Sequence, residues 1–263
     1  MTDAATSEIR IERKGSALWV FIDREHRRNA INPAVIAGIH AAVQMAATDP
    51  GLRAIVLTGV GNKAFCAGAD LSKGTDTFQA MPDEPTTDFG RLARAVKSLG
   101  IPLIARVNGD CVAGGMGLMA LCDLAIASDK ARFGLPEVKV GVFPMQVLVL
   151  LRSQMHARHI NELCLTGKLI SAARALDMGI VNDIAPYEEL DARIEQLISQ
   201  LQSSSPAAVR RGKQAIFAME NMAFHEALAF AEAQIAIAAK GADAVEGLAA
   251  FNEKRKPRWA GEG

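Results

Sequence analysis

The sequence lacks an excess of charge of either sign. Its 263 residues include 29 Lys or Arg and 29 Asp or Glu, so the formal net charge is +0. A general electrostatic affinity for nucleic acid or for anionic membranes comes from a basic excess. The balance therefore predicts no nucleic-acid partner. Hydrophobic residues make up 50% of the chain and charged residues 22%, which is typical of a folded globular protein.

Long apolar runs are also missing. Two apolar stretches without a charged residue or a histidine, Cys111–Cys122 and Val140–Leu151, have 12 residues each, whereas a membrane-spanning helix needs about 20 apolar residues. The first 15 residues contain acidic side chains and no apolar core of the kind found in export signals. These features predict a cytoplasmic protein with no membrane partner.

Motifs for metal, redox and hydrolase chemistry are absent as well. The chain has no CxxC pair, no HExxH and no G-x-S-x-G, so a tight cysteine metal site, a zinc protease and a nucleophile-elbow hydrolase are not indicated. His156 and His159 have helical spacing, but Arg152 and Arg158 beside them favour a solvent-exposed helix face. We expect no metal and no cofactor. Four cysteines are read as reduced core thiols, as expected in the cytoplasm: Cys66, Cys111, Cys122 and Cys164.

Strand and helix signals follow one another through most of the chain. Branched apolar segments predict strands at 9–13, 18–22, 54–58, 103–107 and 124–127. Asn32-Pro33 predicts a helix N-terminus, and Ser203–Pro206 predicts a linker. Ala207–Lys254 is read as an Ala-rich helical stretch interrupted only at three glycines, Gly212, Gly241 and Gly247. We therefore expect an α/β core over residues 1–202 and a helical region over residues 203–263.

Two loops share one construction. Lys63–Leu71 (KAFCAGADL) and Asn108–Leu118 (NGDCVAGGMGL) each follow a buried strand, are rich in Gly and Ala, and lead into a helix. Small residues let backbone N–H groups approach a ligand, and a helix N-terminus adds donors. Two such turns facing one point would bind an anionic oxygen. Tight strand–helix packing explains the same glycines, and the spacing alone favours packing.

Gly115–Ala120 also fits the dinucleotide pattern G-x-G-x-x-A. The next strand begins near Leu124, which leaves a helix of barely two turns. Asp129 comes too soon to be the acidic residue that binds the ribose, which should lie about 20 positions further on. The pattern is therefore a weak indication of a nucleotide site.

One carboxylate stands out. Glu137 lies in Phe133–Val142 (FGLPEVKVGV), after Pro136 and among apolar residues. A carboxylate in a dry loop has a raised pKa and can act as a general acid or base near neutral pH. An ordinary Glu at a helix start, or one paired with Lys139, fits equally well. From the residues alone both interpretations stay open.

Four motifs together resemble the crotonase (enoyl-CoA hydratase/isomerase) family: KAFCAGADL, VNGxxxAGGMGLMALCDLAIAS, FGLPEVKVGVFP and LTGxxISAxxALxxGIVN. Arg28–Asn32 and Phe251–Arg255 resemble the family's first helix entry and its C-terminal helix. The motifs occur in the family's order and cover nearly the whole chain. The resemblance implies a crotonase-type ββα superhelix core with C-terminal helices that form trimers or hexamers. It also implies an acyl-CoA thioester substrate and no further cofactor.

The resemblance also implies residue roles. Ala69 and Gly114 would donate their backbone N–H groups to the thioester oxygen, as an oxyanion hole. Lys254 would reach the CoA phosphates from a neighbouring subunit. Glu137 would be the catalytic residue. The residues expected to bind substrate are Ala67, Gly68, Ala69, Asp70, Leu71, Gly114, Gly117 and Lys254.

The sequence departs from the family pattern at one catalytic position. Family hydratases usually carry two glutamates, but Gly117 occupies the first position and only Glu137 remains. In a hydratase, Glu137 would both activate water and return the proton, and Gly117 would leave room for a branched substrate or a water. The pattern resembles hydratases of branched substrates, isohexenylglutaconyl-CoA of acyclic-terpene breakdown and, more distantly, methylglutaconyl-CoA. We favour this reaction over a single-glutamate Δ3,Δ2-enoyl-CoA isomerase and over a non-catalytic acyl-CoA-binding scaffold.

Overall fold

A six-stranded sheet lies at the centre of the described part of the chain. The computed structural model describes residues 8–78 and 86–260. The sheet has the order β1-β2-β3-β5-β7-β10, in which β1 is antiparallel to β2 and the other neighbours are parallel. Its strands are β1 (Ile9–Lys14), β2 (Ala17–Ile22), β3 (Ala54–Gly59), β5 (Leu103–Val107), β7 (Leu124–Ser128) and β10 (Asp183–Ala185). Strands β3 and β5 are buried along their whole length, as expected for a parallel sheet covered on both faces.

Short strands form a second, four-stranded sheet among the described residues, with the order β4-β6-β8-β9. Its members are β4 (Ala64–Cys66), β6 (Asp110–Val112), β8 (Arg132–Gly134) and β9 (Leu169–Ser171). Each of β4, β6 and β8 follows directly after a strand of the first sheet, and a helix comes next. The repeated unit is therefore strand, short strand, helix, which confirms the α/β fold with a ββα core. The sequence analysis missed this second sheet.

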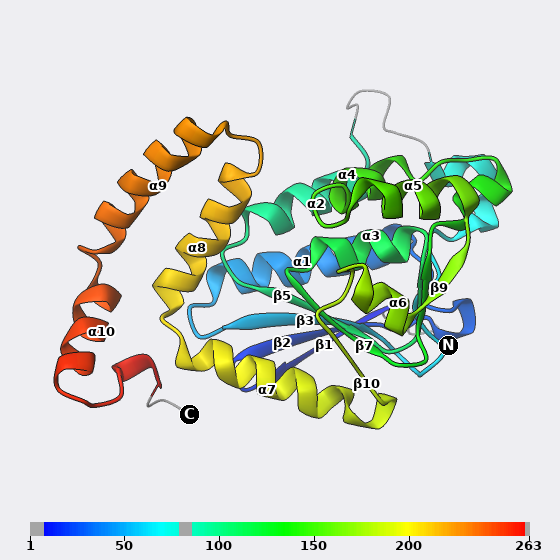
Figure 1. Cartoon of the computed structure of the whole chain (residues 1–263). Helices are drawn as coiled ribbons and strands as arrows, with labels where there is room; N and C mark the ends of the chain where they lie inside the picture. The colour runs from blue at the N-terminus through cyan, green and yellow to red at the C-terminus, as the bar shows by residue number, and fades with distance from the viewer. Residues whose placement is uncertain (1–7, 79–85, 261–263) are drawn as a thin grey trace.

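Helices cover both faces of the six-stranded sheet. Figure 1 shows α1, α2 and α3 on one face and α7 on the other. The α-helices are α1 (Pro33–Thr48), α2 (Asp88–Ser98), α3 (Gly114–Leu121), α4 (Met145–Leu151), α5 (Ala157–Thr166), α6 (Ala172–Asp177), α7 (Leu190–Ser203), α8 (Pro206–Met219), α9 (Phe224–Ala238) and α10 (Ala242–Asn252). The 3-10 helices are η1 (Glu25–Arg27), η2 (Leu71–Phe78), η3 (Pro136–Val140), η4 (Tyr187–Glu189) and η5 (Arg258–Ala260). No helix of the described residues is long and apolar enough to cross a membrane.

Helix α1 begins where the sequence predicts. Asn32 Oδ1 accepts a hydrogen bond from Val35 N at 2.9 Å, and Pro33 occupies the first helical position. An N-cap side chain satisfies one of the N–H groups that the first turn leaves unpaired. On the opposite face, α7 packs Leu190 and Ile194 against Trp19 of β2 in a separate apolar cluster. The sheet is thus fixed between two apolar layers.

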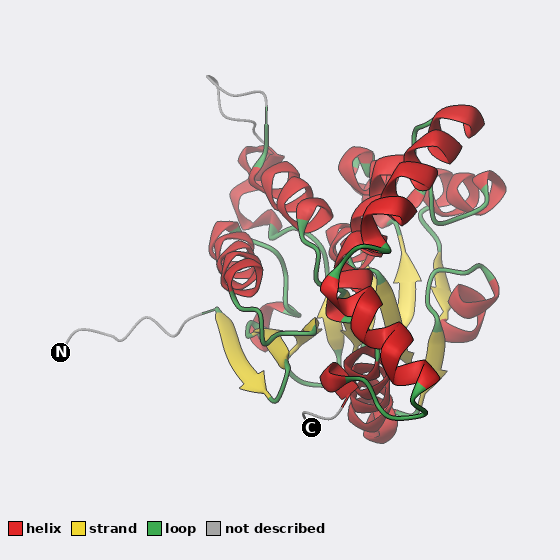
Figure 2. Cartoon of the chain, turned by 90° about the vertical axis from the view of Figure 1, so that its left-hand side faces the viewer, coloured by secondary structure: helices red, strands yellow, loops and turns green. Residues whose placement is uncertain are grey.

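The C-terminal region consists of three helices, α8, α9 and α10, instead of one long helical stretch. We call these three helices the C-terminal frame. Gly212 and Gly247 lie inside α8 and α10, so they do not interrupt helices as predicted. The chain turns after Met219 and again after Ala238, and α9 and α10 run back beside α8 (Figures 1 and 2). Asp243 Oδ2 accepts from Ser205 Oγ at 2.7 Å and closes the frame. Helix α7 ends at Ser203, next to the predicted boundary at 202/203; two separate domains stay a prediction.

Candidate active site

The two Gly-rich turns emerge side by side. Strands β4 and β6 are paired with Cys66 opposite Cys111, so the turns that follow them start from neighbouring positions. A methyl group built on Gly68 would lie 3.4 Å from Gly114 N, and one built on Gly114 would lie 3.6 Å from Ala69 N. The glycines therefore allow a close approach of the two turns. A side chain on Gly68 would also meet Ala113 Cβ at 2.7 Å.

The direction of the Ala69 N–H follows from the peptide that contains it. In this peptide the Gly68 carbonyl accepts from Ile31 N at 2.7 Å. Because a trans peptide is planar, its N–H points opposite to its C=O. The Ala69 N–H is therefore directed away from Ile31. The next N–H along the chain, that of Asp70, donates to Ile31 O at 2.8 Å.

Gly114 presents its N–H at the start of α3. The preceding carbonyl, that of Ala113, accepts from Met116 N at 2.9 Å inside the first helical turn, so the Gly114 N–H points out of the helix. Ala113 itself has φ 51°, a strained conformation for a residue with a Cβ. Its N–H donates to Gly134 O at 2.9 Å, which ties the strained turn to β8.

Neither amide is used internally. Across residues 8–78 and 86–260, neither the Ala69 nor the Gly114 N–H donates to a backbone carbonyl or a side chain. Two adjacent, unpaired N–H groups can together bind an oxygen that carries negative charge. The structure thus brings together both residues that the sequence analysis selected. Their role as an oxyanion hole stays a prediction.

Glu137 lies in η3, shortly after β8, the strand in which Gly134 O accepts from the Ala113 N–H. It follows Gly134 by three residues, so their Cα atoms lie at most about 11 Å apart. Among the described residues, Glu137 Oε2 is the buried side-chain oxygen that lacks a hydrogen-bond partner. Burial raises the pKa of this carboxyl above its ordinary value. No ion pair joins Glu137 to Lys139 in the described chain, so the salt-bridge interpretation is wrong.

The space beside Gly117 is filled. A Cβ at this position would lie 2.9 Å from Phe89 Cζ and 3.0 Å from Val147 Cγ2. Phe89 belongs to α2 and Val147 to α4. The sequence predicts that Gly117 leaves room for a branched substrate or a water. On the side of the residue where a Cβ would lie, this prediction is wrong. The two apolar side chains take up that volume.

Nearby carboxylates are engaged elsewhere. Asp70 Oδ2 accepts from Arg24 Nη2 at 2.9 Å, and this pairing, together with hydrogen bonds from Ser72, lowers the pKa of Asp70 to about 2. Asp110 accepts two hydrogen bonds from Arg132, at 3.0 and 2.5 Å. Asp83 and Glu84, the two acidic residues of segment 79–85, lie outside the described residues. Glu137 is thus the carboxylate here whose surroundings suit proton transfer.

Comparison with known proteins identifies the family. Residues 12–262 match the model of a family described as enoyl-CoA hydratase/isomerase. The chain belongs to this family. It is 32% identical over 257 residues to the 2,3-dehydroadipyl-CoA hydratase of Escherichia coli, covering 97% of this chain and 99% of that protein. It is 32% identical over 265 residues to carnitinyl-CoA dehydratase of the same species, with the same coverage.

A solved structure agrees with this assignment. The crystal structure of an enoyl-CoA hydratase from Mycobacterium smegmatis superposes with a TM-score of 0.87 at 32% identity, covering 96% of this chain and 98% of that one. The family resemblance of the sequence motifs is therefore confirmed. A special likeness to isohexenylglutaconyl-CoA hydratases stays a prediction.

The remaining substrate residues of this enoyl-CoA hydratase/isomerase family member lie at different places. Ala67, Gly68 and Asp70 belong to the Ala69 turn, and Leu71 begins η2 with 49% of its surface exposed. Lys254 lies just beyond the end of α10, and in the view of Figure 1 α8 lies between α10 and α3. Its contact with the CoA phosphates from a neighbouring subunit stays a prediction.

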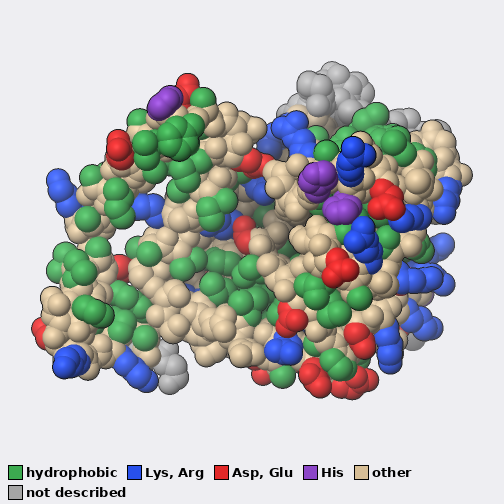
Figure 3. Space-filling model, in the orientation of Figure 1, with side chains coloured by type: hydrophobic (Ala, Val, Ile, Leu, Met, Phe, Trp, Pro, Cys, Tyr) green, Lys and Arg blue, Asp and Glu red, His purple; other side chains and the backbone are tan. Residues whose placement is uncertain are grey.

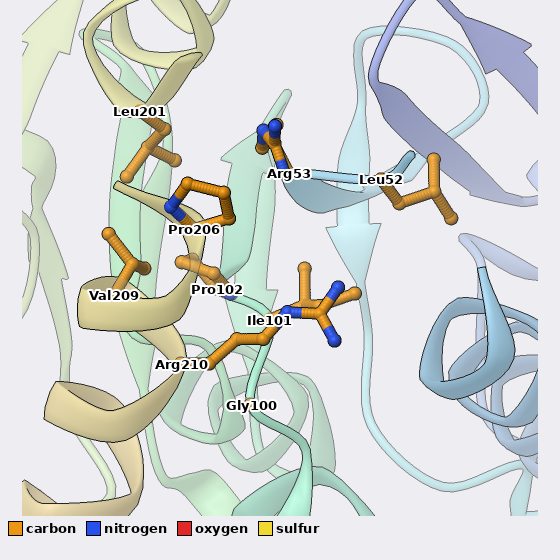
Figure 4. A pocket seen from close by; sticks show the side chains of 9 residues that line it. All are labelled: Leu52, Arg53, Gly100, Ile101, Pro102, Leu201, Pro206, Val209 and Arg210. Carbon is orange, nitrogen blue, oxygen red and sulfur yellow. The ribbon is translucent and has the colours of Figure 1, made fainter. Parts of the chain in front are cut away.

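Sequence reasoning missed residues that surround the turns. Phe89 and Val147 gave no signal, because apolar residues at helical spacing are read as ordinary core. Arg24 pairs with Asp70 across 46 positions, a separation that no local pattern reveals. A pocket beside α8, seen in Figure 4, has Arg53 and Arg210 among its lining residues and contains none of the predicted site residues.

Proposed function

We propose that this protein adds water to the double bond of a conjugated acyl-CoA thioester. One observation carries the proposal: two adjacent amides are unpaired, and the turn that holds one of them is hydrogen-bonded to Gly134, three residues before a buried Glu137 oxygen without a partner. The thioester carbonyl accepts from the Ala69 and Gly114 N–H groups, and Glu137 faces the double bond. CoA enters as part of the substrate, so no separate cofactor is required.

The amides stabilise the charge that forms during the reaction. When hydroxide adds to C3 of the enoyl group, electrons move through C2 to the carbonyl oxygen and give an enolate. Fixed donors bind this oxygen more strongly than they bind the neutral carbonyl. One donor of this kind contributes about 3 kcal/mol to the barrier reduction.

Glu137 carries out both proton transfers. Its carboxylate takes a proton from water as the oxygen bonds to C3, and the resulting carboxylic acid gives that proton to C2. The enolate then returns to a thioester, and the enzyme regains its carboxylate. Burial of the side chain raises the pKa of Glu137, which makes its carboxylate a stronger base for the first proton transfer. Phe89 and Val147 fill the place of a second carboxylate and keep that side of the site apolar.

The proposed substrate has a branched acyl chain, of the isohexenylglutaconyl or methylglutaconyl type. The pairing of AGGMGL with FGLPEVKVGVFPM supports this class, and a cytoplasmic location agrees with it. Ratios of kcat/KM for branched and linear 2-enoyl-CoA substrates test the proposal. We expect the branched substrates to have the higher ratio; a preference for linear chains contradicts it.

A Δ3,Δ2-enoyl-CoA isomerase is the second candidate. The apolar surroundings of Gly117 favour it, because moving a proton from C2 to C4 needs one carboxylate and no water. Ultraviolet absorbance of the conjugated thioester separates the two reactions. Its loss with 2-enoyl-CoA indicates hydration, and its appearance with 3-enoyl-CoA indicates isomerisation. Binding without either change indicates a non-catalytic scaffold.

The C-terminal frame supports assembly into a trimer, or a hexamer of two trimers. Figure 3 shows apolar side chains across α9 and α10. Phe224 (74% exposed), Ile235 (68%) and Phe251 (81%) are examples. Large apolar side chains that are exposed together on one part of the surface are typical of an interface. Light scattering tests this. We expect a trimeric or hexameric mass for the wild type and a smaller species for Phe251→Asp; a monomeric wild type refutes the assembly.

A further inference from the structure

A buried arginine lies beside the Ala69 turn and has no part in the proposed proton transfers. Arg24 is 6% exposed and directly precedes η1. Its guanidinium donates to Glu8 Oε1 at 3.0 Å, to Ala30 O at 2.6 Å and to Asp70 Oδ2 at 2.9 Å. Burying a charge is costly unless its donors are satisfied, and the planar guanidinium can serve several acceptors at once. Arg24 thus connects three separate segments.

Two of these acceptors flank the backbone bridge that orients the Ala69 amide. Ala30 precedes Ile31, and Asp70 follows Ala69. Between them, Ile31 N donates to Gly68 O and Ile31 O accepts from Asp70 N. Arg24 therefore holds both sides of the bridge whose geometry sets the direction of the Ala69 N–H.

We propose that Arg24 is a positioning residue that fixes the Ala69 N–H toward the substrate carbonyl by clamping Ala30 and Asp70. The inference rests on the proposed function, since it gives Arg24 a role only if the Ala69 amide binds the thioester oxygen. Asp70 is the second half of the clamp: its Oδ1 accepts from Ser72 N at 3.1 Å and links the guanidinium to the start of η2. A misplacement of about 1 Å in a reacting geometry can cost about 10²-fold in rate.

Arg24→Lys is the variant that tests the clamp. Lysine keeps the positive charge but has one nitrogen in place of the guanidinium fork, so it cannot hold the three acceptors in the same geometry. Arg106→Lys is the matched control. Arg106 is also buried, at 8% exposure, and its Nε donates to Asp191 Oδ1 at 2.5 Å between β5 and α7. Both variants weaken one buried arginine network, but only the first network touches the Ala69 turn.

Two measurements separate positioning from general stability. The first is kcat and KM with a 2-enoyl-CoA. The second is the red shift in absorbance of a bound, non-reacting conjugated acyl-CoA, which grows as donors polarise its carbonyl. We expect Arg24→Lys to lower kcat about 10- to 100-fold, to change KM little and to reduce the red shift, while Arg106→Lys keeps both. Asp70→Asn should show the same pattern in weaker form, and it carries the test if Arg24→Lys does not fold.

The outcomes are distinguishable. If Arg24→Lys, or Asp70→Asn in its place, matches Arg106→Lys in kcat and in red shift, the Arg24 inference is overturned while the proposed function stands. If the wild type itself shows neither turnover nor a red shift with any enoyl-CoA, the proposed function fails instead. If the wild type is active and Arg24→Lys shows a reduced red shift, the clamp is supported.

Discussion

Replacement of Glu137 by Gln tests the carboxylate at the centre of the proposed reaction. Gln has nearly the same shape but neither accepts nor returns a proton. General acid–base catalysis by one group contributes about 10²- to 10⁴-fold. Because Glu137 serves both proton transfers and Gly117 supplies no second carboxylate, we expect the upper end, a loss of about 10⁴-fold in kcat. This corresponds to about 5 kcal/mol of transition-state stabilisation.

The assay follows the absorbance of the conjugated thioester, with acyl-CoA affinity measured separately by titration. Affinity should stay close to normal, since the two amides and the CoA contacts are unchanged. Glu162→Gln is the matched control, because Glu162 is a partly exposed carboxylate of nearby α5 that is already paired with Lys168. Retention of more than about a tenth of the wild-type kcat by Glu137→Gln, against the loss expected for a general base, would show that the base lies elsewhere.

The pH dependence gives an independent check on the same residue. The base must be deprotonated, and burial raises the pKa of Glu137 above the ordinary 4.5. The acid limb of kcat/KM should therefore lie above pH 4.5. If Asp70 were the base, the limb would lie near its pKa of about 2. Stability depends on pH in the opposite direction to activity. Folding favours the protonated form of Glu137, so the free energy of unfolding decreases as pH rises through the raised pKa. Glu137→Gln should therefore not lower Tm at neutral pH.

Three further predictions concern the surrounding residues. Gly114→Pro deletes one donor, and we expect kcat to fall about 10²- to 10³-fold below that of Gly114→Ala, which keeps the N–H and meets the same Ile31 contact; equal rates would refute the donor assignment. Gly117→Glu forces a side chain against Phe89 and Val147, so unfolding experiments should show a loss of about 1–3 kcal/mol, and faster hydration would contradict the proposed apolar wall. Lys254→Ala should raise KM for acyl-CoA with kcat unchanged in steady-state kinetics, and an unaltered KM argues against a phosphate contact.

The sequence sufficed for the elements whose signals are local. The strands at Ala54–Gly59 and Leu103–Val107 are short runs rich in apolar residues, and α1 begins at an Asn-Pro cap. Each of these signals lies within a few residues. The strands of the second sheet could not be read in this way. Strands of three residues such as β4 and β6 exist because distant segments pair, with Cys66 opposite Cys111.

The candidate site shows the same division. Glu137 and the two glycine turns were found, since each has a recognisable local composition. The interpretation of Gly117 was wrong, because a missing side chain was taken as vacant space. Whether the space is vacant depends on Phe89 and Val147, which lie 28 and 30 positions away along the chain. A glycine therefore predicts that another group lies close to its Cα. Only the fold shows whether that group is a substrate or a core side chain.

The features that suit the site to chemistry are also the ones that weaken the fold locally. Ala113 has a positive φ, and Glu137 keeps a buried oxygen without a partner; both are unfavourable in isolation. Side-chain hydrogen bonds hold the strands that precede the turns: the Ala64 carbonyl at the start of β4 accepts from both Asn29 Nδ2, at 2.7 Å, and Asn108 Nδ2, at 3.1 Å. Rigid side-chain networks thus hold the ends of the short strands in place. We infer that substitutions in these networks lower activity through the turns before they unfold the protein.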